Sequence, residues 1–468
     1  MSFVEFRFLW FFLGAFVVYW TLRHNAARKF WLLVCSYAFY SAWNWKFLFL
    51  LLGSTLVDYT VGMMIGRTSK PAVRRGWLLL SLGVNLGTLA FFKYFNFFAG
   101  SGAEFLAWLG LPASYSTLSI ILPVGVSFYT FQSMSYTIDV YRGRLRAVSS
   151  LLDLSFFIAF FPQLVAGPIV RASTFLPQLA ASRRFATVDV RGALVLFLVG
   201  YIKKACLADG VAGFVDQYFG QPASYSPLGA WIAVLLYTVQ IYCDFSGYTD
   251  MAIASARLLG YELTLNFNFP YLAQNIADFW HRWHISLSTW LRDYLYIPLG
   301  GNRGPRWFVF RNIMLTMLLG GLWHGAAWTF VLWGAMHGLA LAVHRLWREK
   351  ATCQPLLAGF MAWLRWPLTL YFVCLAWVLF RATDLGQAGV VMRAFVLGRG
   401  NGTRDLPVWL LGVVLIFGLL HWLNARGEFA RWWRRGPDPL FAAGYGCVVA
   451  GVLLFVPTHY TPFIYFQF

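Results

Sequence analysis

The feature that most constrains the fold is a series of long apolar runs separated by short basic loops. Several runs reach the roughly 20 residues that a helix needs to cross the hydrocarbon core of a bilayer, beginning with Phe3–Leu22. Of the 468 residues, 59% are hydrophobic and 12% are charged, whereas soluble domains carry about 25% charged residues. The sequence therefore predicts an all-α polytopic membrane protein with roughly eleven or more membrane-embedded segments.

The formal net charge of +19 is explained by where the basic residues lie. They flank the apolar runs, for example at 67–75 and 142–146, which is the distribution that sets membrane topology. Such loops also suit contact with anionic lipids. We therefore expect membrane lipids as partners and no nucleic acid.

Placing the basic loops on the cytoplasmic side gives a consistent start, with the N-terminus outside. The predicted crossings are Phe3–Leu22, Phe30–Trp43, Phe47–Gly66, Trp77–Phe98 and Leu118–Tyr141.

The run Leu151–Val170 is different, because it contains Pro162 and Gly167-Pro168. A broken or re-entrant segment fits it better than a straight crossing. Further crossings are expected near 190–207, 228–249, 309–326, 328–344, 357–380, 406–425 and 439–457, and the Gly-rich, basic stretch 382–405 is predicted to be a loop.

Ionisable residues gather between Gln240 and Gly338, within this apolar context. Charged and titratable groups at membrane depth are costly, and by default they indicate a functional site. For Asp244 and Asp250 we favour a structural role, pairing with Arg257 or Arg282, over tuning a histidine. The full set is Asp244, Asp250, Asp278, His281, His284, Asp293, His324 and His337.

Residues from about 272 to 296 are too polar to span a membrane, and their spacing predicts an interfacial or half-buried amphipathic helix. On such a helix His281, His284 and Ser288 would form one polar stripe. The zinc-binding helix motif has two histidines four residues apart and a glutamate, which this segment lacks, so we predict no metal site. A purely structural role for His284 remains an alternative.

His324 is the strongest candidate for a catalytic residue. It lies in an apolar run among Gly320, Gly321 and Gly325, which allow backbone or substrate to approach closely. An imidazole exchanges protons near neutral pH, so His324 is suited to act as a general base. The alternative is a histidine that only packs against a neighbouring helix, and His337 is a weaker second candidate.

Taken together, these motifs resemble those of the membrane-bound O-acyltransferase family, and most of all its bacterial polysaccharide-acetylating branch. The resemblance covers nearly the whole chain. The matching blocks are 122–132, 136–143, 161–168, 242–250, Phe279-Trp-His-Arg-Trp-His284 with its continuation to Tyr294, 296–301 and Leu322-Trp-His-Gly-Ala326.

The resemblance implies a fold and an activity. It implies one domain over 1–468, with a catalytic core at about 118–345, built as a ring of tilted helices around a central funnel with re-entrant and amphipathic helices. The implied reaction is transfer of acetyl from a cytoplasmic thioester, expected to be acetyl-CoA, across the bacterial inner membrane. A periplasmic partner within an exopolysaccharide biosynthesis complex would then complete O-acetylation of a polymer such as alginate, and no bound cofactor is implied.

The resemblance also assigns residues. The family's invariant histidine matches His324 and its second histidine matches His284, so we predict both as catalytic. We predict contacts with substrate from His281, Ser288, Trp323 and Asn266, and oxyanion stabilisation from the backbone N–H groups of Trp323 and Gly325 or from Asn266 or Asn268. The alternatives are D-alanyl or peptidoglycan acyl transfer, a transporter or flippase of a lipid-linked intermediate, and a scaffold without chemistry.

Overall fold

The computed structural model describes residues 1–112, 117–351, 361–427, 433–434, 436–454 and 463–464. Within these ranges the secondary structure is helical, with one isolated bridge between Tyr225 and Arg404 and no strand. The prediction of an all-α protein is therefore confirmed. The α-helices are α1 (Phe6–Thr21), α2 (Asn25–Asn44), α3 (Leu48–Arg67), α4 (Pro71–Leu89), α5 (Phe95–Trp108), α6 (Val126–Tyr141), α7 (Leu151–Ala159), α8 (Phe161–Leu164), α9 (Ala172–Ala180), α10 (Val190–Tyr201), α11 (Asp209–Gly220), α12 (Pro227–Leu258), α13 (Ile276–Arg282), α14 (Ile285–Leu291), α15 (Arg306–His324), α16 (Trp328–Ala351), α18 (Arg365–Arg381), α19 (Leu385–Leu397), α20 (Leu410–Ala425) and α22 (Asp438–Leu453).

Short 3₁₀ and π-helical segments join or extend these helices. Three of them are π-helical, a form that is rare and often found at functional positions. The π-helical segments are η2 (Ala90–Tyr94), η4 (Ile202–Ala208) and η7 (Arg292–Tyr296), and the 3₁₀ segments are η1 (Trp45–Phe47), η3 (Phe185–Thr187), η5 (Pro222–Ser224), η6 (Pro270–Leu272) and η8 (Met361–Leu364).

Three helical stretches in the described part of the chain have the length and apolar composition needed to cross a membrane: Asn25–Arg67, Pro71–Trp108 and Pro227–Leu258. Four shorter helices are also apolar: α1, α19, α20 and α22. The predicted crossings near 357–380 and 439–457 coincide with α18 and α22, while residues 352–360 and 455–457 lie outside the described ranges.

The chain divides into two compact units. Unit 1 comprises Met1–Phe197 and Met251–Thr264, and unit 2 comprises Leu198–Asp250 and Leu265–Phe468. Helices α10 and α12 each run from one unit into the other.

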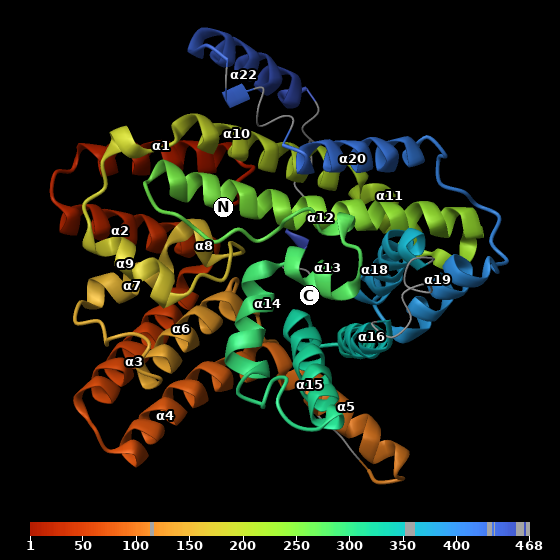
Figure 1. The fold of residues 1–468 in the computed structure, drawn as a ribbon, viewed down its shortest axis with the longest axis horizontal. Helices are drawn as coiled ribbons and strands as arrows, with labels where there is room; N and C mark the ends of the chain where they lie inside the picture. The colour runs from red at the N-terminus through yellow and green to blue at the C-terminus, as the bar shows by residue number, and fades with distance from the viewer. Residues whose placement is uncertain (113–116, 352–360, 428–432, 435, 455–462, 465–468) are drawn as a thin grey trace. The chain divides into compact units, whose positions relative to one another are not determined.

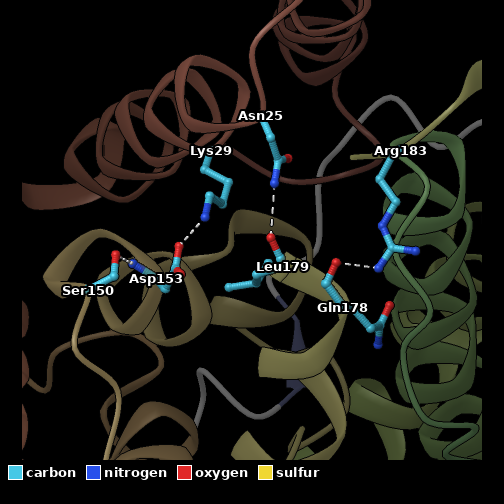
Figure 2. A network of polar contacts seen from close by, with 7 residues as sticks. All are labelled: Asn25, Lys29, Ser150, Asp153, Gln178, Leu179 and Arg183. Carbon is cyan, nitrogen blue, oxygen red and sulfur yellow. Dashed lines mark hydrogen bonds and ion pairs between the residues drawn. The ribbon is translucent and has the colours of Figure 1, made fainter. Parts of the chain in front are cut away.

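Polar contacts at the start of α2 tie together several segments of unit 1 (Figure 2). Asn25 donates to the Leu179 carbonyl at the end of α9, over 3.0 Å, and Lys29 pairs with Asp153 in the first turn of α7. Ser150 caps α7 by accepting from the Asp153 N–H. These bonds join α2 to α7 and α9, and the three helices lie close together at the left of Figure 1.

The predicted interruption between 151 and 170 is present. Helix α7 ends at Ala159, the Phe160 backbone turns away from helical geometry, and α8 lasts one turn. Every residue from Leu154 to Val170 is buried. Irregular backbone at this depth requires surrounding protein, and here unit 1 supplies it.

Three predicted elements need correction. The crossing predicted from Leu118 is helical only from Val126, after Pro123 and after Gly125 with φ 76°. Neither proline nor a glycine with left-handed backbone fits the interior of a helix, so this helix begins only after Pro123 and Gly125.

The stretch 382–405, predicted to be a loop, contains α19. Asp384 caps this helix by accepting from the Gln387 N–H at 2.8 Å, and Gly398 ends it with φ 60°. The buried residues Ala388, Val391 and Phe395 recur at helical spacing, a signal that the flanking glycines and arginines obscured.

The amphipathic helix predicted from 272 to 296 is divided into α13 and α14. Trp283 is extended and His284 has φ 43° and ψ 53°, so the helix stops and restarts. His281 and His284 consequently do not share a stripe: the side chain of His281 is exposed, whereas His284 is 0% exposed.

Candidate active site

The turn at His284 is one of two points in the described part of unit 2 where a residue other than glycine has a left-handed backbone. In the described residues, only Phe269 and His284 have positive φ without being glycine. Holding a non-glycine residue there costs on the order of 1–3 kcal/mol, and such strain tends to gather at functional sites. The surrounding bonds must therefore over-determine this turn.

Asn266 provides those bonds. Its Oδ1 accepts from the Ser286 N–H at 3.1 Å and from the Ser286 hydroxyl at 2.9 Å, and it lies 3.1 Å from His284 Nδ1. The Asn266 carbonyl also accepts from the Ile285 N–H at 2.9 Å. One side chain and its backbone thus hold the whole turn from His284 to Ser286.

These contacts determine the tautomer of His284. Because the Ser286 backbone N–H can only donate, the Asn266 atom facing it must be the amide oxygen. An oxygen with no hydrogen obliges His284 Nδ1 to carry the proton, so in the neutral ring Nε2 is an acceptor. Among the described residues, neither His284 Nε2 nor Asn266 Nδ2 has a hydrogen-bond partner, and both side chains are fully buried. The turn therefore presents one proton acceptor and one N–H donor to an incoming group.

His324 lies beside this turn. It is the last residue of α15 and is 3% exposed, and its ring centre is 6.4 Å from that of His284. A small group such as a hydroxyl can reach both rings at that separation. Aromatic rings surround the two imidazoles: Phe245 meets His284 edge-on at 4.7 Å, and Trp333 and Phe380 lie 5.1 and 5.2 Å from His324.

Close backbone packing positions His324. A Cβ on Gly321 would lie 2.3 Å from the Phe330 carbonyl oxygen, so α15 and α16 touch at this level (Figure 1). A Cβ on Gly325 would lie 2.0 Å from the Phe330 ring. The prediction that these glycines permit close approach of backbone is confirmed for Gly321, whereas Gly325 instead makes room for the Phe330 ring.

We expect Gly321→Ala to separate α15 from α16, because the new methyl group meets backbone atoms that cannot rotate away. Overpacking of this kind costs roughly 1–3 kcal/mol, and it should displace His324 and lower turnover. The matched control is Gly320→Ala, whose Cβ would meet only the flexible end of Leu291 at 3.2 Å. Thermal unfolding and acetyl transfer should separate the two variants, and equal behaviour would contradict this account.

The two buried aspartates of α12 have partners that the sequence analysis did not identify. Asp244 pairs with Lys204 at 2.6 Å and Asp250 with Lys203 at 2.6 Å, both lysines lying on the π-helix η4. The predicted partners are engaged elsewhere, Arg257 with Glu262 and Arg282 with Asp278. The structural reading of the two aspartates is supported, but the predicted pairing is wrong.

The missed signal was a pair of adjacent lysines within the apolar run 190–207. Lys204 also pairs with Asp209 at 2.6 Å, so one buried cation joins two carboxylates. Asp244 additionally accepts from the Ile464 N–H at 2.9 Å. This network secures η4, α12 and residue 464 within unit 2.

The other predicted site residues lie at different distances from the histidine pair. Trp323 is buried, and its ring centre is 6.0 Å from that of His284. Ser288 Oγ donates to the Trp283 carbonyl at 3.2 Å, which supports the same turn. The side chain of His281 is exposed, in contrast to the buried side chains of His284 and His324.

His337, the weaker second candidate, is fully buried on α16. Its ring lies 4.6 Å from Trp333 and 5.2 Å from Trp280. Neither ring nitrogen has a hydrogen-bond partner within the described ranges. The Trp333 ring therefore contacts both His337 and His324.

Several known proteins are similar to most of this chain. The model of the membrane-bound O-acyltransferase family matches residues 143–383, which include both histidines. The probable alginate O-acetylase AlgI of Pseudomonas aeruginosa is 44% identical over 81% of this chain and 72% of its own length. The corresponding protein of Pseudomonas putida is 39% identical over 98% of this chain and 99% of its own.

A relative that is named for a different acetyl acceptor is also similar to this chain. The peptidoglycan O-acetyltransferase of Helicobacter pylori is 40% identical over 82% of this chain and 77% of its own length. The family model covers more than half of the chain, and these relatives are well above 30% identity over most of their lengths. This chain therefore belongs to the membrane-bound O-acyltransferase family.

Proposed function

We propose that this protein takes acetyl from a cytoplasmic thioester, acetyl-CoA, and passes it across the bacterial inner membrane for O-acetylation of an exopolysaccharide such as alginate. The observation that carries the proposal is the buried pair of His284 and His324, together with Asn266 Nδ2 and His284 Nε2, neither of which has a hydrogen-bond partner within the described ranges. The polymer class is supported by two similar proteins, both of which are named as probable alginate O-acetylases.

In the proposed reaction, a nitrogen of His324 removes the proton from the acceptor hydroxyl as its oxygen attacks the thioester carbonyl. The carbonyl oxygen becomes an oxyanion, and Asn266 Nδ2 donates a hydrogen bond to it. The carbon–sulfur bond then breaks, and the leaving thiolate takes the proton from His324. Acetyl ester and thiol are formed with no net change in protons.

His284 has a separate role in this proposal. Its Nε2 accepts a hydrogen bond from the acceptor hydroxyl and so orients it toward His324. The ring of Trp323 packs beside that of His284. His281 and Ser288 remain predicted substrate contacts, with His281 placed to meet a group arriving from solvent or headgroups.

We further propose that the protein is one multi-pass domain over 1–468, with roughly eleven tilted helices in a ring around a central funnel. The all-helical fold and the three long apolar stretches support this arrangement. A funnel would let the thioester arrive from the cytoplasm and the acceptor from the periplasm. A periplasmic protein would then complete transfer to the polymer.

The test is acetyl transfer by the purified full-length protein in nanodiscs. Radiolabelled acetyl-CoA is supplied on its own and then with the periplasmic partner and polymer, and release of CoA is followed together with the label. We expect thioester turnover that needs the acceptor. An absence of turnover under all conditions would contradict acetyl-CoA as donor and would favour a carrier-protein thioester or the transporter alternative.

Peptidoglycan is the second candidate acceptor, because the Helicobacter pylori relative is similar over most of both chains. The same assay with isolated peptidoglycan in place of exopolysaccharide distinguishes the two. Label recovered as an ester on peptidoglycan alone would replace alginate-like polymers as the acceptor.

We expect Asn266→Asp to lower kcat for acetyl transfer by roughly 100-fold or more, the usual cost of losing one oxyanion donor. Aspartate keeps an acceptor for Ser286 and His284 but has no N–H. Asn266→Ala should in addition unfold at a lower temperature, because it leaves the Ser286 N–H without its acceptor. Thr289→Val, which alters a hydroxyl bonded only within α14, is the control. Full activity of Asn266→Asp would exclude the amide N–H from catalysis.

A further inference from the structure

A second buried polar centre lies in unit 1, in the middle of α3. The Asp58 side chain is 0% exposed. In the described part of the chain no lysine, arginine or histidine pairs with it, unlike Asp244 and Asp250. It is therefore a buried carboxyl group without a basic partner.

Its neighbours are neutral oxygen- and nitrogen-bearing side chains from α4 and α6. Ser81 Oγ lies 2.6 Å from Asp58 Oδ1, and Asn85 Nδ2 lies 3.1 Å from each carboxylate oxygen. Thr137 Oγ1 is 3.0 Å from Ser81 Oγ. Helices α3, α4 and α6 lie side by side at the lower left of Figure 1, so the cluster occupies the interior of a three-helix packing.

Two further oxygens at this centre have no hydrogen-bond partner in the described part of the chain. One is Ser133 Oγ on α6, which lies beside the Asp58 carboxyl group but outside hydrogen-bond geometry with it, and the other is Asn85 Oδ1, on the branch of the amide that does not face the carboxylate. Both residues are almost fully buried, at 0% and 1% exposure. Leaving a buried polar atom unpaired costs free energy, and each such atom calls for an explanation.

Charge limits what can complete the cluster. An isolated carboxylate in an apolar interior is strongly unfavourable unless a positive charge compensates it. The cluster carries a single negative charge, because the serine, threonine and asparagine side chains are neutral. One monovalent cation would neutralise it, whereas a divalent ion would leave an excess positive charge. Carboxylate, hydroxyl and amide oxygens are ligands that hard cations prefer.

We propose that Asp58, Ser81, Asn85, Ser133 and Thr137 form a binding site for a monovalent metal cation, Na⁺, between α3, α4 and α6. The site would tie the three helices together when the ion is bound. It is independent of the histidine pair, and the proposal does not rest on the proposed acetyl transfer.

A proton is the competing way to neutralise Asp58, and the two ligands differ in their consequences. A proton bonds to one carboxylate oxygen and engages at most one further acceptor. A cation coordinates several oxygens at once, here the Asp58 carboxylate together with hydroxyl oxygens such as Ser81 Oγ and Ser133 Oγ. Binding of a cation therefore depends on sodium concentration at fixed pH, whereas protonation depends on pH alone.

The experiment is thermal unfolding of the full-length protein in detergent, in sodium chloride and in choline chloride at equal ionic strength and pH. We expect Tm to rise by several degrees and to keep rising with the logarithm of the sodium concentration above Kd, because a ligand that binds only the folded state stabilises it by RT ln(1 + [Na⁺]/Kd). Asp58→Asn should abolish the response. Equal Tm values in both salts for the wild type would overturn the proposal and leave a protonated carboxyl group.

Ser133→Ala keeps the test decisive if Asp58→Asn does not fold. It should weaken the sodium response by roughly 10-fold in affinity, which equilibrium binding of radioactive sodium measures directly. The matched control is Ser255→Ala, which also removes from unit 1 a fully buried hydroxyl that has no hydrogen-bond partner among the described residues. A Ser133→Ala protein with unchanged sodium affinity, or a Ser255→Ala protein with the same loss, would contradict the assignment.

Discussion

Replacing His324 with alanine is expected to lower kcat for acetyl transfer by roughly 100-fold or more, the range that general-base catalysis contributes. KM for the thioester should change little, because the imidazole acts on the acceptor hydroxyl rather than on the donor. The measurement is release of CoA and formation of labelled ester by the purified protein. Unaltered turnover would exclude a catalytic role for His324 and leave the scaffold alternative.

Two further variants separate chemistry from packing. His324→Gln retains a polar side chain of similar size but cannot serve as a base, so it should be as inactive as the alanine variant. His421→Ala removes another buried imidazole of unit 2, one that packs against Tyr242 and Phe269 away from the Asn266 turn. It should keep turnover within a few-fold of wild type. A large loss in His421→Ala would show that turnover is sensitive to any missing buried ring.

The largest effect on stability is expected from Lys204→Met. Lys204 is 1% exposed and is the shared partner of Asp209 and Asp244, which are 6% and 4% exposed. Removing one partner of a buried ion pair costs about 3–5 kcal/mol, because the remaining charge is left uncompensated. Thermal unfolding, followed through the 23 tryptophans, should show a clear fall in Tm.

A rescue experiment tests the reason for that loss. Adding Asp209→Asn and Asp244→Asn to Lys204→Met removes the uncompensated charges, so most of the stability should return. Lys203→Met is the matched comparison, since the Lys203–Asp250 pair is 19% and 13% exposed and its loss should cost less. If the triple variant is no more stable than Lys204→Met, packing rather than charge explains the effect.

The helical class and the long apolar helices were readable from the sequence because they depend on local composition. Apolar runs of sufficient length predict helices wherever they occur, and α12, α15 and α16 lie close to the predicted ranges. The interruption after Ala159 was also readable, because proline and glycine interrupt helices through their own backbone properties. The sequence prediction missed α19 because the glycines and arginines around it are typical of a loop, and its repeat of apolar residues is short.

The site was only partly readable. His284 and His324 were recognisable as unusual residues in an apolar context, but their separation of 40 positions says nothing about distance in space. Helical spacing placed His281 and His284 on one face, and this was wrong because the chain leaves helical geometry at Trp283 and His284. That geometry is strained locally and is held by Asn266, 18 residues away.

The sequence by itself determined the membrane class, the all-helical fold and the residue types able to carry acyl-transfer chemistry. Only the tertiary structure decided which of those residues meet: His284 with Asn266 and His324, Asp244 with Lys204, and Asp58 with the neutral side chains of Ser81 and Asn85. The physical reason is the distance along the chain over which each interaction acts. Hydrophobicity and helix propensity act on neighbours along the chain, whereas the tautomer of a histidine and the partner of a buried charge depend on groups that folding brings together.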